Sequence, residues 1–486
     1  MFELYPPDFL RILPELILSG MALFILTMGA VKKAEFCGHI TTLSFLLAGG
    51  ALFLSHKMGK AGIGFEGQIL EDDFSYVGKI LILIASYGAF SLSVFPLIRE
   101  KLLSFEYAAL TLLATTGMLL MMGANDFINL FVGLEMQGLS LYVLAALNRH
   151  ETKTAEAALK YFILGALGTV FYLYGAGFLY GFSGSTNFGV LAAAIHMDAS
   201  SLPLGLYVGT LLIVSALCFK IAAVPFHMWT PDVYEGCPTP VVTFIATAPK
   251  VVGVLVLLRL LFYPFMAVYA QWVPLLLALS LVSMVVGTFA ALVQTNLKRF
   301  LAYSTIGQMG YVLLGIASGP QEGIQAVLMY ISLYLVMVLG VFGCVLCLQS
   351  KKVGGIQTLE DLSGLSKFHP RLAFLLALFM FSLAGIPPFA GFFSKFYLLK
   401  AAISAELYFF ATLGILISVV AAAYYLRIIK IMYFDKRDEL TSDFYGVLSS
   451  QAVIVMGLCG GISLFFCLFS DPFFKLIHHA AVVCAG

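Results

Sequence analysis

Four ionisable side chains lie within long apolar stretches of this 486-residue sequence. They are Glu135, Lys220, Lys250 and Lys395. A charge at the centre of a bilayer costs about 2.5–3.5 kcal/mol on insertion scales, so four charges require contact with one another or with water. In an apolar site a carboxylate stabilises a neighbouring protonated amine, and its withdrawal favours release of the proton. The residue types therefore indicate a proton relay, in which a Glu135–Lys220 pair is the gate and water joins the lysines.

The energies of such a relay are mutually compatible. Two protonated lysines about 7 Å apart repel by about 2.4 kcal/mol at an effective dielectric constant of about 20. Moving one charge through 100 mV requires about 2.3 kcal/mol, so an arriving proton can drive the next one onward. The alternative for a single basic residue is a side chain that snorkels to the membrane surface. We expect a snorkelling side chain for Arg259, near a span end, and consider one as the alternative for Lys395. For Glu15, beside Pro14, we expect a structural contact.

Composition excludes several classes of protein. Hydrophobic residues make up 61% of the chain and charged residues 11%, against about 25% charged residues in soluble domains. A soluble enzyme would need an almost wholly apolar surface, and a disordered chain would be far less hydrophobic. The 27 Lys and Arg balance the 26 Asp and Glu, which argues against nucleic-acid binding. No motif predicts a metal or cofactor site in this chain. Six cysteines lie in apolar runs and fit core positions: Cys37, Cys218, Cys344, Cys347, Cys459 and Cys467.

Apolar stretches long enough to cross a membrane recur along the whole chain. A spanning helix needs about 20 mostly apolar residues, and the stretches are too long for the strands of a membrane barrel. The sequence therefore predicts an all-α, polytopic membrane protein of about fourteen transmembrane helices. The acidic N-terminus lacks the features of a signal peptide. The expected spans are 10–30, 37–55, 75–96, 104–122, 126–147, 157–181, 204–228, 240–262, 272–293, 301–317, 324–348, 371–399, 404–430 and 450–470.

The distribution of Lys and Arg predicts the orientation. Sixteen follow odd-numbered spans, six lie on the opposite side, with Lys79 counted among them, and five lie within spans. The positive-inside rule then places both termini outside the cytoplasm, which in a bacterial inner membrane is the periplasmic side.

Two blocks of five spans indicate an inverted repeat. Spans 4 to 8 and spans 9 to 13 are similar in length, and an odd number of helices makes the second block begin from the opposite face. The fourth span of each block contains a helix-breaking proline, at Pro225 and at Pro387–Pro388. Interrupted spans persist only where the backbone is buried in protein or lines water, although a proline can also simply kink a packed helix. The predicted domains are an N-terminal three-helix segment (1–103), two repeats (104–262 and 263–430) and a C-terminal helix and tail (431–486).

Three further residues are candidates for the relay. Glu156 and Lys160, four residues apart, fit either a helix-surface pair or the entrance of the relay. His227 follows Pro225 by two residues and could extend a water path.

Several segments resemble the antiporter-like membrane subunits of respiratory complex I. They are GLEMQGLSLYVL at 133–144, AALKYFILGA at 157–166, FKIAAVPFHMWTPDVYEG at 219–236, APK at 248–250, NLKRFLAYS at 296–304 and GIPPFAGFFSKFY at 385–397. The lysine in the last segment is similar to the subunit N branch of that family. The resemblance covers essentially the whole chain. It implies the fourteen-helix fold and a role for Glu135, Lys220, Lys250 and Lys395 in proton transfer.

Three positions depart from the family pattern. Gln308 occupies a position that is usually histidine, and glutamine cannot titrate. The link between Lys250 and Lys395 would therefore depend on water or tyrosine, with Gln308 lining the path. Phe389 and Ser394 replace a more usual threonine and glycine near the second break.

The resemblance implies a non-redox, proton-translocating subunit of an NADH:quinone oxidoreductase. NADH, FMN, Fe–S clusters and quinone would belong to partner subunits, and the neighbours of this chain would be another antiporter-like subunit and small membrane subunits. Two alternatives remain: a subunit of a Mrp-type cation/proton antiporter, and a structural membrane subunit with inert charges.

Overall fold

The structure is a computed structural model of a bundle of long helices. It describes residues 6–31, 37–58, 62–197, 202–350, 354–355, 357–436, 444–446, 449–468 and 470–485. The helices are α1 (Pro6–Arg11), α2 (Leu13–Val31), α3 (Cys37–Lys57), α4 (Asp73–Arg99), α5 (Phe105–Gly123), α6 (Phe127–Ala145), α7 (Thr152–Ser183), α8 (Phe188–Met197), α9 (Leu204–Ile221), α10 (Trp229–Gly236), α11 (Thr239–Ala246), α12 (Ala248–Phe262), α13 (Tyr269–Leu292), α14 (Leu297–Ala317), α15 (Glu322–Cys347), α16 (Leu365–Phe368), α17 (Pro370–Ala384), α18 (Ala390–Ser404), α19 (Tyr408–Tyr433), α20 (Ser450–Phe465) and α21 (Ser470–Ala485).

Two small sheets connect helix ends. Strand β1 (Gly62–Gly64) pairs antiparallel with β2 (Ile69–Glu71), so that Gly62 lies opposite Glu71. Strand β3 (Leu348–Ser350) pairs with β4 (Gly354–Gly355) and β5 (Phe444–Gly446).

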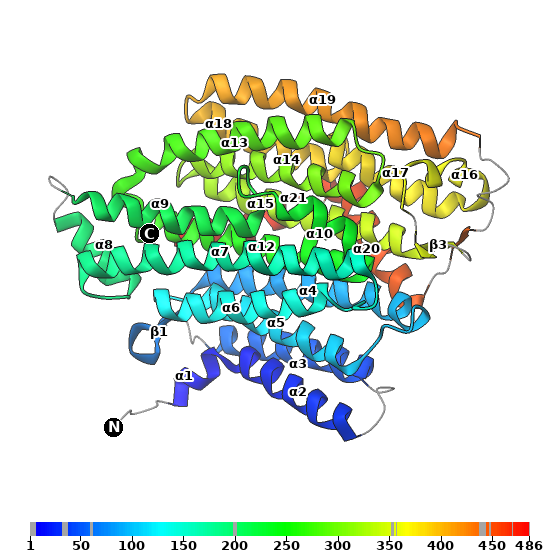
Figure 1. Cartoon of the computed structure of the whole chain (residues 1–486). Coiled ribbons are helices and arrows are strands. Elements are labelled where there is room, and N and C mark those ends of the chain that lie inside the picture. Colours follow the sequence, from blue (N-terminus) through cyan, green and yellow to red (C-terminus); the bar gives the residue numbers. More distant parts are fainter. Residues whose placement is uncertain are drawn as a thin grey trace.

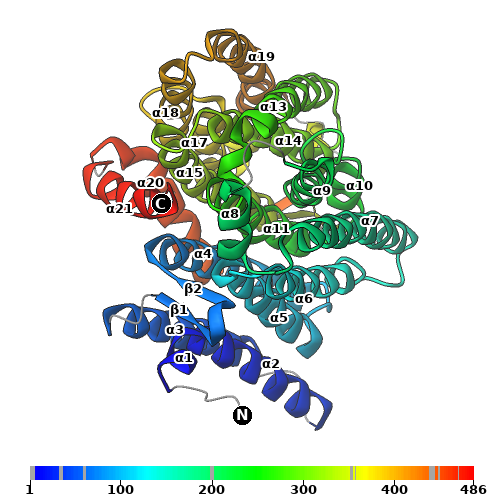
Figure 2. The ribbon, with the colours of Figure 1, turned by 90° about the vertical axis from the view of Figure 1, so that its left-hand side faces the viewer.

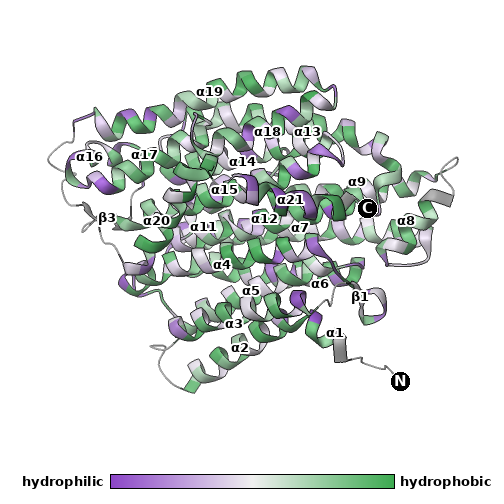
Figure 3. Cartoon of the chain, turned by 180° about the vertical axis from the view of Figure 1, so that it is seen from behind, coloured by the Kyte–Doolittle hydropathy of each residue, from purple (hydrophilic) through white to green (hydrophobic). Residues whose placement is uncertain are grey.

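The helices lie roughly side by side and follow the chain from one end of the molecule to the other (Figure 1). Helices α2 and α3 form one end, and α18 and α19 form the opposite end. The C-terminal helices α20 and α21 return to pack against α15 and α4, far from α19 (Figure 2). Hydrophobic residues predominate along flanking helices such as α19 (Figure 3), as expected for surfaces that face lipid.

Polar side chains begin several of these helices. The first turn of a helix leaves backbone N–H groups without partners, and Ser, Asp or Asn at the N-cap accepts from them. Ser104 accepts from Tyr107 N to begin α5, Asp126 from Ile128 N to begin α6, and Asn296 from Lys298 N and Arg299 N to begin α14. The positions of α6 and α14 matter here because these helices carry Glu135 and Gln308.

Helices α11, α12, α14 and α15 form the centre of the bundle. Their apolar side chains are almost wholly buried, whereas α2, α7, α19 and α20 expose most of theirs. Lys250 on α12 and Gln308 on α14 are therefore carried by helices that other helices surround.

Thirteen helices in the described part of the chain are long and apolar enough to cross a membrane. The chain is thus an all-α, polytopic membrane protein. The expected span at 371–399 consists of two fifteen-residue helices, α17 and α18. They are separated at the predicted second break, so the total of fourteen spans and the repeat stay predictions.

Both proline-containing segments interrupt their helices. Helix α9 ends at Ile221, and Ala222 takes the left-handed conformation with φ 64°, which is costly for any residue but glycine. Helix α17 ends at Ala384, and the following Gly385 has φ 85°, where glycine meets no such cost.

Three expectations about single residues are wrong. Lys79 is not a loop residue: it lies within α4 and is 1% exposed. Arg259 does not snorkel: it is 7% exposed, because it forms a bidentate pair with Asp72. Cys467 is exposed in the short 3-10 turn that follows α20, while the other cysteines are buried. Six of the flanking basic residues lie outside the described residues: Lys32, Lys33, Lys60, Lys351, Lys352 and Arg437.

Candidate functional site

Glu135 and Lys220 face one small cavity between α6, α7 and α9. The cavity is also lined by Thr169 and Tyr172. The Glu135 carboxylate accepts a hydrogen bond from Thr169 Oγ1 at 2.5 Å. Within the described part of the chain no ion pair of 4.0 Å or less joins Glu135 to Lys220, so the two predicted partners share a cavity without direct contact.

Lys220 lies one residue before the end of α9. Its amine is 5.9 Å from the centre of the Tyr142 ring, a distance at which an aromatic face attracts a cation. Because α9 ends at Ile221, the backbone carbonyls of its last turn lack helical partners. Trp229 Nε1 donates to one of them, Phe219 O, at 3.1 Å.

The Lys220 carbonyl receives a second lysine. Lys250 Nζ lies 3.4 Å from Lys220 O and 4.6 Å from the centre of the Trp229 ring. Lys250 is fully buried. The break after α9 therefore supplies both an acceptor and an aromatic face to the central amine, and it places Lys220 and Lys250 next to each other.

His227 lies in the same break, between α9 and α10. It is partly buried, and its Nδ1 has no hydrogen-bond partner among the described residues. A neighbouring helix also binds the backbone of this break, because Val224 N donates to Ser283 Oγ of α13 at 2.9 Å.

A buried polar network occupies the space between Lys250 and Lys395. Gln308 donates from Nε2 to Tyr425 OH at 3.1 Å and accepts from Tyr330 OH. Ser304 Oγ lies 2.5 Å from Tyr425 OH. We call Ser304, Gln308, Tyr330 and Tyr425 the central network.

The central network has neighbours on both sides. Tyr334 OH lies 3.2 Å from Thr305 Oγ1 and 3.5 Å from Ala246 O, two residues before α12 begins. Toward the other end, Tyr311 lies on α14 three residues after Gln308. Polar atoms thus continue along α14 from the side of Lys250 to the side of Lys395.

Lys395 on α18 is held by the second break. Its amine donates to Leu383 O at 3.0 Å, Ala384 O at 3.1 Å and Ser418 Oγ at 3.3 Å. It lies 5.5 Å from the centre of the Tyr311 ring. The residue is 6% exposed, so it does not snorkel. The free carbonyls at the end of α17 thus accept from Lys395, as the Lys220 carbonyl at the end of α9 does from Lys250.

The two family departures near this break have local partners. Phe389 stacks on Phe381, with ring centres 5.9 Å apart. Ser394 Oγ donates to Gly391 O at 2.8 Å.

Glu156 and Lys160 form an ion pair of 2.8 Å at the start of α7, and both are substantially exposed. Lys160 also lies 2.8 Å from Asp232 of α10. Arg299 of α14 lies 2.9 Å from both Asp232 and Glu235. Burial acts to raise the pKa of Asp232, but the hydrogen bonds from Lys160 and Arg299 hold it below its usual value.

Sequence reasoning missed Asp232 and the tyrosines of the central network. Asp232 lies inside a quoted segment, but its partners come from α7 and α14. Tyr330 and Tyr334 are four residues apart on α15, a spacing that places two hydroxyls on one helix face. No group of three or more metal-binding side chains was found among the described residues.

Comparisons with known proteins agree in one family. The family described as "NADH:quinone oxidoreductase/Mrp antiporter, TM" matches residues 124–421. The NADH-quinone oxidoreductase subunit N of Parvibaculum lavamentivorans is 44% identical over 470 residues, which cover 96% of this chain and 95% of the relative. Subunit N of Paramagnetospirillum magneticum is 43% identical over 480 residues, 98% of either chain.

Solved structures have the same fold. A chain of respiratory complex I from Thermus thermophilus with bound aureothin is 30% identical, with a TM-score of 0.80, covering 96% of this chain and 99% of that one. A chain of the Mrp complex from Dietzia sp. has a TM-score of 0.84 at 20% identity and covers 98% of either chain. The second likeness shows the fold alone.

Proposed function

We propose that this chain, which belongs to the membrane-subunit family of NADH:quinone oxidoreductases and Mrp antiporters, translocates protons. Its relatives reported above are NADH-quinone oxidoreductase subunits N. The proposed relay consists of Glu135, Lys220, Lys250 and Lys395. Quinone reduction elsewhere in an NADH:quinone oxidoreductase would drive the relay. Flavin, Fe–S clusters and the sites for NADH and quinone would belong to partner subunits.

The observation that carries this proposal is the shared environment of the two deepest lysines. Lys250 and Lys395 are both buried, and both amines point at carbonyls freed by an interrupted helix. Carbonyl partners and aromatic faces stabilise a protonated amine without a neutralising carboxylate. Such an amine can gain and lose a proton with little rearrangement.

The route between the lysines would use the central network. Gln308 cannot exchange a proton, but it orients the hydroxyls of Tyr330 and Tyr425, which can donate and accept. Glu135 would be the gate through the cavity that it shares with Lys220. Glu156 and Lys160 would lie at the uptake end, and His227 would line the water path.

From the distribution of Lys and Arg we also infer a bacterial inner membrane with both termini on the periplasmic side, and from the two blocks of five spans a domain division at 103, 262 and 430. Neighbouring antiporter-like and small membrane subunits would be the partners. A Mrp-type antiporter is the less supported alternative, because hard cations such as sodium prefer oxygen ligands, whereas the deepest charged groups on this route are amines.

The test is proton pumping by the assembled complex. Inverted membrane vesicles carrying Glu135→Ala or Lys220→Met should lose NADH-driven acidification by about ten-fold or more, as expected for loss of a group that transfers protons. NADH oxidation with an artificial electron acceptor should be unchanged, which shows that the redox subunits are assembled. Lys400→Met, at an exposed lysine, is the matched control.

Wild-type acidification per NADH oxidised in both variants would overturn the relay. Sodium-dependent proton exchange by a purified chain that carries no flavin or Fe–S absorbance would instead support the antiporter.

A further inference from the structure

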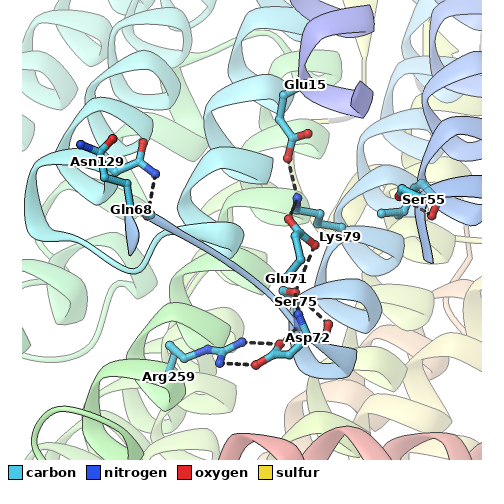
Figure 4. A network of polar contacts seen from close by, with 10 residues as sticks. Glu15, Ser55, Gln68, Glu71, Asp72, Ser75, Lys79, Asn129 and Arg259 are labelled. Carbon is cyan, nitrogen blue, oxygen red and sulfur yellow. Dashed lines mark hydrogen bonds and ion pairs between the residues drawn. The ribbon is translucent and has the colours of Figure 1, made fainter. Parts of the chain in front are cut away.

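A buried cluster of charges lies at the end of the bundle opposite Lys395. Lys79 of α4 is 1% exposed and contacts two carboxylates: Glu15 Oε1 of α2 at 2.7 Å and Glu71 Oε1 of β2. We call these three residues the Glu15–Lys79–Glu71 triad. Figure 4 shows Lys79 between the two carboxylates. None of the three belongs to the proposed relay.

The charges of the triad do not balance. Two ionised carboxylates and one amine leave a net charge of −1 in a buried site, which is costly. Glu15 is 3% exposed, and its Oε2 is buried without a hydrogen-bond partner in the described part of the chain. A buried acceptor without a partner calls for a donor, and a carboxyl proton would supply the missing charge and the missing donor together.

The surrounding groups do not remove this excess of negative charge. Asp72, the N-cap residue of α4, is neutralised by Arg259 of α12 through bonds of 2.5 and 2.7 Å. Arg11 of α1 pairs with Asp8 at 2.6 Å. His56 of α3 stacks on Tyr76, and Cys484 of α21 lies near Arg259 and Asp72. Burial raises the pKa of Glu71; Lys79 opposes the rise and Glu15 adds to it, so that the pKa remains above its usual value.

The triad has a route to water. A small cavity beside it is lined by Arg11, Ser55, His56, Glu71, Asp72 and Tyr76, and the His56 side chain at its edge is 38% exposed. Glu71 therefore lies between the outside and the buried Lys79 and Glu15.

We propose that Glu15 and Glu71 share one proton across Lys79, and that the triad is a proton-binding site that exchanges with the water at this face through the cavity beside His56. Two carboxyl groups in one site cannot both ionise freely, so the proton is retained where an isolated carboxyl would lose it. The Asp72–Arg259 pair connects this site to α12, the helix that carries Lys250.

Isotope-edited infrared spectroscopy of the full chain in nanodiscs tests the proposal. Chain labelled with ¹³C-glutamate should show the carbonyl band of a protonated carboxyl at neutral pH, and alkaline buffer should remove it. Glu15→Gln and Glu71→Gln should each abolish the band, because the remaining carboxylate then pairs with Lys79 alone. Glu66→Gln, an exposed residue on the same connection, should keep it.

Three results would overturn the proposal: no protonated band in the wild-type chain, a band that persists in both Gln variants, or a band lost in only one of them. Absence of the band from the wild-type chain needs no substitution, so it overturns the proposal even if a variant fails to fold.

Discussion

Lysine amines in this protein have two kinds of buried environment. Lys79 is paired with carboxylates, whereas the partners of Lys250 and Lys395 among the described residues are carbonyls, a hydroxyl and aromatic rings. A carboxylate partner fixes the charge of an amine strongly, while neutral partners leave the charged and uncharged forms closer in free energy. The difference separates groups that hold charge from groups suited to pass a proton on.

Gln308 is the residue at which a substitution would interrupt the proposed route between the lysines. Gln308→Leu removes the acceptor of Tyr330 and the donor to Tyr425. It leaves the buried Tyr330 hydroxyl without this acceptor, at a cost of about 1–3 kcal/mol, while Tyr425 keeps its contact with Ser304. We expect NADH-driven acidification by vesicles to fall several-fold, while Gln308→His retains most of it. Ser332→Ala, which removes a buried hydroxyl that donates to Leu328 O of its own helix, should have no effect. Equal loss in the leucine and alanine variants would argue against a specific route.

Asp72 predicts a pH dependence of stability. Burial acts to raise its pKa, but the bonds from Arg259 hold the pKa below the usual value. A carboxyl with a lowered folded-state pKa stabilises the fold fully above its unfolded pKa of about 3.9 and loses this effect as the pH falls through the folded-state value. Asp72→Asn leaves Arg259 buried without its partner, which costs about 3–5 kcal/mol.

Thermal unfolding of the detergent-solubilised chain measures this effect. The apparent Tm of Asp72→Asn should lie well below that of the wild type from neutral pH down to about pH 4, and the gap should narrow at lower pH. Asp73→Asn, at the next and more exposed carboxylate, should change little. A constant gap through the acidic range would contradict the assignment.

The helix breaks are the elements that create the acceptors for Lys250 and Lys395. At the second break, Gly385 has φ 85°, and a Cβ there would lie 3.0 Å from Lys395 Cδ. Gly385→Ala therefore strains the backbone by about 1–2 kcal/mol. The added Cβ also displaces the aliphatic part of the Lys395 side chain. We expect reduced acidification and a lower apparent Tm. Gly457→Ala, where a Cβ meets nothing within 4 Å, is the control, and an equal effect of both substitutions would count against the break.

The sequence predicts the helices and their interruptions more completely than it predicts the contacts between helices. Long apolar runs predict helices, and Pro225 and Pro387 mark the two interruptions, because these signals are local. The partners of Lys79 were missed because Glu15 and Glu71 come from α2 and β2, and only the packing of these elements on α4 brings them together. Tyr330 and Tyr425 were missed because tyrosine in an apolar run fits a core position equally well.

At the scale of the whole molecule, the buried lysines and the network between them follow the long direction of the bundle. Lys250 is on central α12, Gln308 on central α14, and Lys395 on α18 at one end (Figure 1). Arg299 of α14 also joins the two halves through Asp232 and Glu235 of α10. The proposed lateral transfer of protons would therefore need no large opening of the bundle.

The placement of Lys79 strengthens the predicted orientation. With Lys79 removed from the outer loops, the sequence has sixteen basic residues after odd-numbered spans and five on the opposite side, since 6 − 1 = 5. The positive-inside rule then favours termini in the periplasm more strongly. Alkaline phosphatase needs disulfides that form in the oxidising periplasm, so a fusion after Gly486 should be active and a fusion after Arg149 inactive. Fluorescent-protein fusions at the same two positions should give the opposite pattern, and an active phosphatase at Arg149 would reverse the assigned orientation.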